Sequence, residues 1–221
     1  MPKRALIEHR PWLLASIAAA VAFYFLRDSE VLAGVQTMLL KGAGVALLAA
    51  YAWRRGKGTD ALLLTTYLAF GAIGDMLIEL SVLYGGIAFF AGHIAAIALF
   101  LRNRREDPSG SQKAFAAVLL VSTPVICWLL SGSFQIGLYG IGLGAMAATA
   151  WLSRFSRYRV GIGAVLFVIS DFLIFSEMGP LDLGRIPALL IWPLYYLGQL
   201  MIATGVVQRL RKDRKIEAKQ Q

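Results

Sequence analysis

The sequence has few of the residues from which soluble enzymes and metal proteins are built. Charged residues make up only 16% of its 221 residues, against about 25% in a typical soluble domain. A single cysteine, Cys127, excludes an intramolecular disulfide and a multi-cysteine metal site. The sequence also lacks a Walker loop, a Gly-x-Ser-x-Gly segment and a His-Glu-x-x-His segment. These absences set aside ATPases, serine esterases and zinc proteases of those types.

Long apolar stretches, in contrast, are abundant. Hydrophobic residues make up 58% of the chain, and a bilayer core takes about 20 apolar residues per helix. Eight stretches predict an all-α, polytopic membrane protein with eight transmembrane helices, at 11–27, 34–53, 60–80, 86–102, 113–130, 134–152, 160–177 and 187–208. Seven helices is the alternative count, because some stretches lie close together. No small-residue cleavage site follows Phe25, so the first stretch is expected to remain as a helix.

The net charge of +9 is distributed as in a membrane protein rather than a nucleic-acid-binding protein. All lysines and arginines except Arg27, Lys41 and Arg185 fall at the two ends of the chain or on every second connection. The positive-inside rule therefore predicts that the N and C termini are both cytoplasmic. We interpret the basic clusters as topology signals and lipid-headgroup contacts, with no nucleic acid as partner. The expected location is a bacterial inner membrane.

The chain is expected to be a single membrane domain, 1–221, made of two similar halves. Three segments match in the same order: 41–53 with 139–151, 73–78 with 169–174, and 89–93 with 195–199. They predict a first four-helix repeat over 11–105 and a second over 110–209, followed by a basic, mobile cytoplasmic tail over 210–221. Four is an even number, so both repeats enter from the same side and are parallel.

Six polar residues from six expected helices share one layer in the outer half of the membrane. Ionisable side chains at bilayer depth are unfavourable by at least a few kcal/mol, so they face the bundle interior and have a function by default. The layer consists of Lys41, Asp75, His93, Tyr139, Asp171 and Tyr195. Tyr196 and Gln199 continue a polar stripe on the last helix. A polar, aromatic-walled cavity between the two halves is the inference.

Each of these residues also has a simpler interpretation. Glu79 and Glu177 lie near helix ends, which favours an interfacial position. Lys41 can extend outward as an anchor, and His93 can be a packed polar residue. Asp75 and Asp171 are short, deep and at matching places in the two halves, so we predict a functional role for this pair.

Four segments resemble the lysoplasmalogenase, or YhhN-like, membrane family. They are Gly-Asp-Met-Leu-Ile around Asp75, Phe-Phe-Ala-Gly before His93, Leu-Phe-Val-Ile-Ser before Asp171, and Tyr-Tyr-Leu-Gly before Gln199. The resemblance extends from Lys41 to Val207. The sequence departs from the family pattern at three places, where it has Gly42 instead of proline, Phe172 instead of a small polar residue, and Ala96 instead of tyrosine.

The resemblance implies an eight-helix enzyme that hydrolyses the vinyl-ether bond of 1-alkenyl lysophospholipids, with no metal or redox cofactor. Such a reaction needs a proton donor for the alkene carbon and a carboxylate that stabilises an oxocarbenium ion or activates water, as in glycoside hydrolysis. Asp171 stands among Phe167, Phe172 and Ile174, a setting suited to a proton donor. Asp75 is then the base or cation stabiliser, and the reverse assignment remains open.

The other polar residues of the layer are expected to bind the lysophospholipid. Lys41 is assigned to the lipid phosphate or to tuning Asp75, with His93 as a further neighbour of Asp75. The ether oxygen and water are assigned to Tyr139, Tyr195, Tyr196 and Gln199.

Two other functions fit parts of the pattern. A proton- or cation-coupled transporter also combines repeats with a buried acidic pair, although only Pro124 and Pro193 lie in the middle of expected spans and no matched broken helices are evident. A lipid-binding or scaffold protein is the third possibility. The headgroup preference and the oligomeric state do not follow from the sequence.

Overall fold

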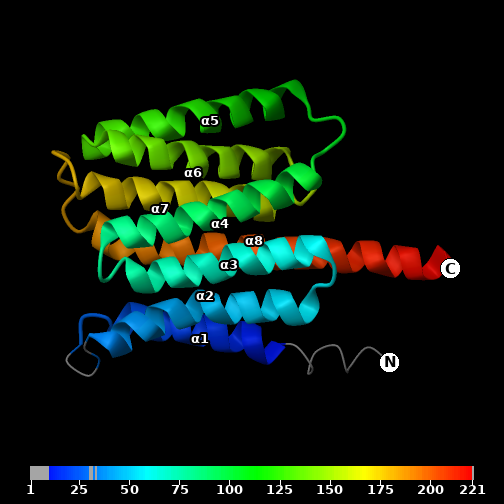
Figure 1. The fold of residues 1–221 in the computed structure, drawn as a ribbon, viewed down its shortest axis with the longest axis horizontal. Helices are drawn as coiled ribbons and strands as arrows, with labels where there is room; N and C mark the ends of the chain where they lie inside the picture. The colour runs from blue at the N-terminus through cyan, green and yellow to red at the C-terminus, as the bar shows by residue number, and fades with distance from the viewer. Residues whose placement is uncertain (1–9, 30–31, 33, 221) are drawn as a thin grey trace. The chain divides into compact units, whose positions relative to one another are not determined.

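A computed structural model describes residues 10–29, 32 and 34–220 of the chain (Figure 1). These residues form eight α-helices and one short π-helix, with no β-strand among them. The helices are α1 (Arg10–Leu26), α2 (Val35–Arg55), α3 (Thr59–Leu77), α4 (Val82–Arg102), α5 (Gly110–Ser131), α6 (Phe134–Leu152), η2 (Arg157–Gly161), α7 (Ile162–Ser176) and α8 (Ile186–Gln220). The predicted all-α class is confirmed, and each apolar stretch coincides with one α-helix.

Six helical segments are long and apolar enough to cross a membrane, among the residues described: α2, α3, α4, α5, η2 with α7, and α8. Helix α1 is apolar but has only 17 residues. Helix α6 has 19 residues, and its four glycines and Gln135 reduce its hydropathy. The protein is therefore a multi-pass membrane protein, whereas the count of eight spanning helices stays a prediction.

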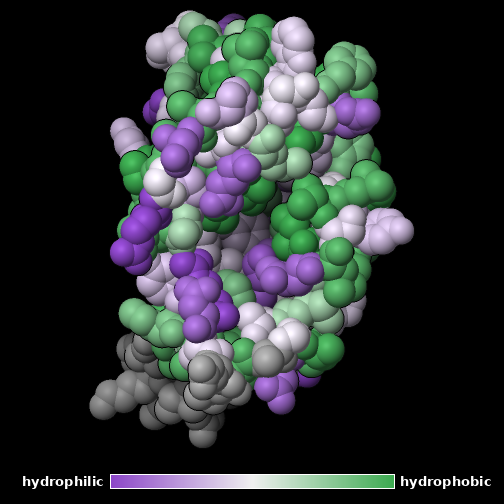
Figure 2. Space-filling view, turned by 90° about the vertical axis from the view of Figure 1, so that its left-hand side faces the viewer, coloured by the Kyte–Doolittle hydropathy of each residue, from purple (hydrophilic) through white to green (hydrophobic). Residues whose placement is uncertain are grey.

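Large apolar side chains are exposed along several helices, as lipid-facing surfaces require. Phe25 of α1 is 73% exposed, and Val121 and Leu129 of α5 are 65% and 64% exposed. Figure 2 looks onto the ends of the helices at the left of Figure 1 and shows hydrophobic residues interspersed with hydrophilic ones on that face. In water, so much exposed apolar surface would promote association; hydrocarbon tails solvate it.

The chain forms two compact units. The first contains Met1–Ala95 and Val207–Gln221, and the second contains Ala96–Val206. The boundaries therefore fall within α4 and α8, each of which contributes residues to both units.

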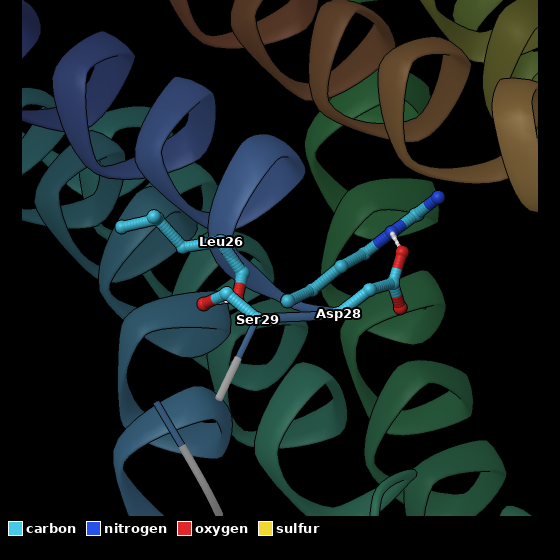
Figure 3. Close-up of polar contacts among 4 residues, drawn as sticks. Leu26, Asp28 and Ser29 are labelled. Carbon is cyan, nitrogen blue, oxygen red and sulfur yellow. Dashed lines mark hydrogen bonds and ion pairs between the residues drawn. The ribbon is translucent and has the colours of Figure 1, made fainter. Parts of the chain in front are cut away.

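In the first unit, α2 packs against both α1 and α3 (Figure 1). The hydroxyl of Ser16 on α1 donates a hydrogen bond to the carbonyl of Gly44 on α2. At the end of α1, the Ser29 hydroxyl donates to the Leu26 carbonyl over 2.7 Å, and Arg27 forms an ion pair with Asp28 (Figure 3). The Leu26 carbonyl, near the end of the helix, thus accepts both the Ser29 hydroxyl and the Ser29 backbone N–H, the latter over 3.0 Å.

The basic tail is helical, as part of α8, as far as Gln220, and its mobility and cytoplasmic position stay predictions. An ion pair between Arg209 and Asp213, at 3.0 Å and four residues apart, supports the helix. In the first unit, Arg214 also donates to the carbonyl of Arg55, the last residue of α2, over 2.8 Å. A cation at a helix C-terminus is favourable because of the helix dipole.

In the second unit, α5, α6 and α7 pack side by side (Figure 1). The connection that follows α4 and the connection that follows α6 are hydrogen-bonded to each other near the ends of these helices. The Arg154 backbone N–H donates to the Asn103 carbonyl over 2.7 Å, and the Arg105 backbone N–H donates to the Leu152 carbonyl over 2.9 Å. The side chain of Arg154 also donates to the side-chain oxygen of Asn103. These bonds fix the ends of α4 and α6 and hence the entry of the chain into α7.

Helices α7 and α8 approach each other through two glycines. A β-carbon at Gly198 would lie 2.6 Å from the carbonyl oxygen of Gly163, closer than any side chain can approach. Small residues at such crossings are the usual way in which membrane helices come into contact. The site residues on α7 and α8 are positioned by this crossing.

We expect Gly198→Ala to destabilise the protein by about 1–3 kcal/mol, because the added methyl group collides with backbone rather than with a movable side chain. The thermal midpoint of the detergent-purified protein measures this effect. Gly86→Ala, on α4, is the matched control, since a β-carbon there meets nothing within 4 Å. Equal midpoints for the two variants would contradict the close crossing.

Candidate functional site

The candidate site residues divide between the two compact units. Lys41, Asp75 and His93 belong to the first unit. The second unit holds Tyr139, Asp171, Tyr195, Tyr196 and Gln199. The pairing of Asp75 with Asp171 stays a prediction.

Asp75 and His93 are both buried in the first unit, on α3 and α4. Gly74 precedes Asp75, and a β-carbon at Gly74 would lie 2.9 Å from the ring of Phe89 on α4. Gly92 precedes His93, and a β-carbon there would lie 3.2 Å from the carbonyl oxygen of Tyr67 on α3. Two glycines thus let α3 and α4 pack closely on either side of these polar residues.

Lys41 forms an ion pair in the first unit that was not expected from the sequence. Its Nζ donates to Oε1 of Glu79 at 2.5 Å, and Glu79 lies in the turn after α3. The side chains of Lys41 and Glu79 are 17% and 41% exposed. Lys41 also lies 5.7 Å from the ring centre of Phe23 on α1. The sequence led us to expect that Lys41 binds the lipid phosphate or tunes Asp75, and both stay predictions; in the structure Lys41 pairs with Glu79.

Asp171 is held by Tyr139 in the second unit. The Tyr139 hydroxyl on α6 donates to Oδ2 of Asp171 on α7 over 2.8 Å, and the Asp171 side chain is buried. The Phe175 ring, one turn beyond Asp171, meets the Tyr139 ring edge-on at 5.7 Å between centres. A buried carboxyl group needs such a partner, and the aromatic contact restricts the phenol to one orientation.

The aromatic residues of α8 form a cluster next to α7. The Trp192 ring stacks on Tyr196 at 6.0 Å between centres, and Tyr195 meets Phe167 of α7 edge-on at 5.2 Å. Ser170, next to Asp171, donates to the Ile191 carbonyl of α8 over 2.9 Å. Asp171 on α7 and the aromatic cluster on α8 are therefore held in fixed positions relative to each other by these contacts.

Gln199 lies one turn beyond this cluster and is fully buried. Neither its amide nitrogen nor its amide oxygen has a hydrogen-bond partner within the described part of the chain. A buried amide of this kind usually binds a water molecule or a ligand. Gln199 therefore has hydrogen-bonding capacity left for a small polar molecule.

Positions that the sequence repeat treats as equivalent make equivalent helix contacts. Lys41 on α2 contacts Glu79, four residues after Asp75. In the second half, Tyr139 on α6 contacts Phe175, four residues after Asp171. The same two positions therefore join the helices in both halves, as an ion pair in one and as an aromatic pair in the other.

A second pair of contacts follows the same correspondence. Gly92 approaches the carbonyl of Tyr67, and Gly198 approaches the carbonyl of Gly163. Gly92 and Gly198 are equivalent in the repeat, and Tyr67 and Gly163 stand at the same offset from Asp75 and Asp171. Backbone geometry around the two acidic residues is therefore built in the same way.

Sequence reasoning missed the parts played by Phe175 and Glu79. Phe175 looked like one more apolar residue, and Glu79 looked interfacial. Extending the match between 73–78 and 169–174 by one residue pairs Glu79 with Phe175. This extension would have indicated that the two residues occupy equivalent positions. Among residues 10–29, 32 and 34–220, no three His, Cys, Asp or Glu side chains are grouped as a metal site would require.

The fold and these residues define an all-helical, multi-pass membrane protein with acidic side chains buried among its helices. The chain belongs to the YhhN family, whose model matches residues 36–206. That range includes every candidate site residue.

Two relatives carry the name lysoplasmalogenase. They come from Mycobacterium bovis (strain ATCC BAA-935 / AF2122/97) and Mycobacterium tuberculosis (strain CDC 1551 / Oshkosh). Each is 29% identical to this chain over 179 residues, covering 75% of this chain and 68% of the relative. No solved structure matches the chain.

Proposed function

We propose that this protein is a lysoplasmalogenase-type membrane hydrolase. It cleaves the vinyl-ether bond of a 1-alkenyl lysophospholipid and releases a fatty aldehyde and a glycerophospho-alcohol. The observation that carries the proposal is a buried Asp171 held by the Tyr139 hydroxyl within membrane helices. The names of the two relatives support the same activity.

The reaction requires one proton donor and one water molecule. A proton is added to the alkene carbon that is not bonded to oxygen, and the carbon bonded to oxygen becomes an oxocarbenium ion. Water adds to that carbon and loses a proton, which gives a hemiacetal. The hemiacetal then breaks its bond to the glycerol oxygen, which takes up a proton, and the aldehyde is released. No electrons are gained or lost overall, so no redox cofactor takes part.

We assign the first proton to Asp171. Tyr139 occupies Oδ2 of the carboxyl group, so Oδ1 is the oxygen that carries the proton to the substrate. Apolar surroundings, including the nearby Phe175 ring, favour a neutral acid over a charged one before the reaction. Tyr139 is then a positioning residue that acts through Asp171, rather than a residue that contacts the ether oxygen as the sequence suggested.

We assign water activation and stabilisation of the cation to Asp75. Asp75 is buried in α3 at the position equivalent to Asp171. An oxocarbenium ion carries positive charge, which a carboxylate stabilises far more strongly in a water-poor site than in water. The reverse assignment exchanges the two roles of Asp75 and Asp171.

The remaining site residues are assigned to substrate. Gln199 has both amide atoms available for water or for the ether oxygen. Tyr195 and Tyr196 provide an aromatic wall beside it. His93 lies buried in α4 at the position equivalent to Gln199 and is assigned to the same layer. Lys41 binds the lipid phosphate.

For the topology, we propose eight membrane-spanning helices in two parallel repeats of four, over 11–105 and 110–209. The matching contacts of Lys41 with Glu79 and of Tyr139 with Phe175 support the duplication. The basic connections and both termini then face the cytoplasm of a bacterial cell. We include α1 and α6 among the eight spanning helices. Helix α1 is short and can cross the bilayer with little tilt, and the glycines of α6 let it pack closely against its neighbours.

Asp171→Asn and Asp75→Asn should each lower kcat by about 10²- to 10⁴-fold, the usual contribution of a general acid or base. Aldehyde release from lysoplasmenylcholine by detergent-purified protein measures the activity. Asp107→Asn, on an exposed connection, is the matched control and should retain full activity. Full turnover by either site variant would contradict the proposed roles of the two acidic residues. No turnover by folded wild-type protein would contradict this substrate and favour another lipid substrate or transport.

Tyr139→Phe should lower kcat by about 10- to 100-fold and leave KM nearly unchanged, because a hydrogen bond to an acidic group is lost while the ring contact with Phe175 remains. The same aldehyde assay gives both constants. Tyr158→Phe makes the same chemical change at a residue that is 77% exposed and should have no effect. A raised KM with normal kcat would instead place the Tyr139 hydroxyl on the substrate.

Asp107→Cys and Asp182→Cys test the topology, because Cys127 is the only cysteine of the chain and is buried. Asp107 precedes α5 and Asp182 precedes α8, and both are exposed. A membrane-impermeant maleimide added to whole cells should label the Asp182 variant alone. Lysed cells should show labelling of both. Labelling of the two variants to the same extent in whole cells would contradict the predicted orientation.

A further inference from the structure

The ion pair between Lys41 and Glu79 is an unusual choice for joining two membrane helices. Lys41 lies six residues, or about 9 Å, from the start of α2. The two side chains are 17% and 41% exposed, and a solvent-exposed ion pair contributes only about 0–1 kcal/mol to stability. The pair therefore calls for an explanation other than stability.

The second unit provides an internal comparison. Tyr139 and Phe175 occupy the equivalent positions and contact each other without any charge. Helices α6 and α7 are thus joined at this point by an aromatic pair and by the hydrogen bond from Tyr139 to Asp171. Since uncharged side chains suffice there, the charges of Lys41 and Glu79 are not needed to hold α2 against α3.

Both charged groups have hydrogen-bonding capacity left. The Lys41 ammonium has three N–H donors and gives one to Oε1 of Glu79. The Glu79 carboxylate can accept about four hydrogen bonds, and its side chain is 41% exposed. Contact with the Phe23 ring holds the Lys41 ammonium at 5.7 Å from the ring centre, which limits its motion. A cation and an anion are therefore presented next to each other in a fixed order.

We propose that Lys41 and Glu79 form the headgroup subsite, with Lys41 binding the phosphate and Glu79 binding the positively charged amine of a zwitterionic lysophospholipid. This inference rests on the proposed function and deepens it. It assigns to Glu79 the selection of zwitterionic headgroups, such as phosphocholine and phosphoethanolamine, over headgroups that carry only the phosphate. In the bound state, the substrate phosphate lies beside Lys41 and the substrate amine lies beside Glu79. The zwitterionic headgroup has no net charge, so the net charge in the site does not change on binding.

The first test compares two substrates that differ only in the amine. One is the 1-alkenyl lysophosphocholine, and the other is the 1-alkenyl glycerophosphate, which has no cation. In Glu79→Gln, KM for the zwitterion should rise about fivefold, as expected for the loss of one partly exposed charge contact. KM for the phosphate substrate should stay constant or fall, because a repelling carboxylate is removed. Both kcat values should be unchanged.

Glu177→Gln is the matched control. Glu177 is exposed at the end of α7, outside the proposed subsite, and its replacement should leave both KM values as they are. If Glu79→Gln raises KM for the two substrates equally, or for neither, the assignment of Glu79 to the amine is wrong.

The second test moves the aromatic pair of the second unit into the first. The double variant Lys41→Tyr with Glu79→Phe should keep its thermal midpoint, because the equivalent positions already pack in this way around α6 and α7. It should bind both substrates more weakly, since the phosphate has lost its cation, and should no longer distinguish them. A double variant that fails to fold would show that the charges serve the fold and would overturn the proposal.

The outcomes separate this inference from the proposed function. Wild-type protein that releases no aldehyde from either substrate contradicts the hydrolase itself. Wild-type protein that turns over both substrates, while Glu79→Gln keeps the wild-type KM ratio, leaves the hydrolase standing and removes only the headgroup subsite.

Discussion

A polar group within membrane helices must find its partner inside the protein, and this requirement organises the structure around its acidic residues. Lipid offers no hydrogen bonds, so an unpaired group is unfavourable by several kcal/mol. Tyr139 meets this requirement for Asp171 with a neutral hydroxyl. Lys41 and Glu79 meet it for each other with opposite charges. The two solutions create different electrostatic surroundings in the two halves, and we assign different chemistry to them for that reason.

The helix crossings beside the acidic residues are alike in the two halves, while the side chains at those crossings are not. Gly92 and Gly198 approach a backbone carbonyl on the preceding helix at corresponding places. Because a backbone contact of this kind does not depend on neighbouring side chains, it persists when those side chains change. His93 and Gln199, the residues that follow these glycines, illustrate the point, since both are buried and polar but differ in chemistry. Under the proposed duplication, the two halves can hold two acidic residues in similar positions and give them unlike neighbours.

Among the described residues, hydropathy was sufficient to locate the apolar part of each α-helix, because the length of an apolar stretch depends on the membrane and not on the partners of the helix. It could not show how each helix is rotated or which residues meet. The pairing of Lys41 with Glu79 depends on the rotation of α2 against α3, and a single sequence carries little information on that angle. The helical tail was missed for a related reason, since its charges suggested solvent, whereas the contact of Arg214 with the Arg55 carbonyl depends on the fold.

The internal repeat is the one sequence feature that could have given these contacts. Glu79 is hydrophilic and Phe175 is hydrophobic, yet each lies four residues after its acidic residue, Asp75 or Asp171. A repeated position with unlike residues indicates a repeated contact, because the backbone brings the same two places together in each half. In the roles that we propose, the Phe175 ring restrains Tyr139, the partner of Asp171, in one half, and the Glu79 carboxylate attracts a cation in the other.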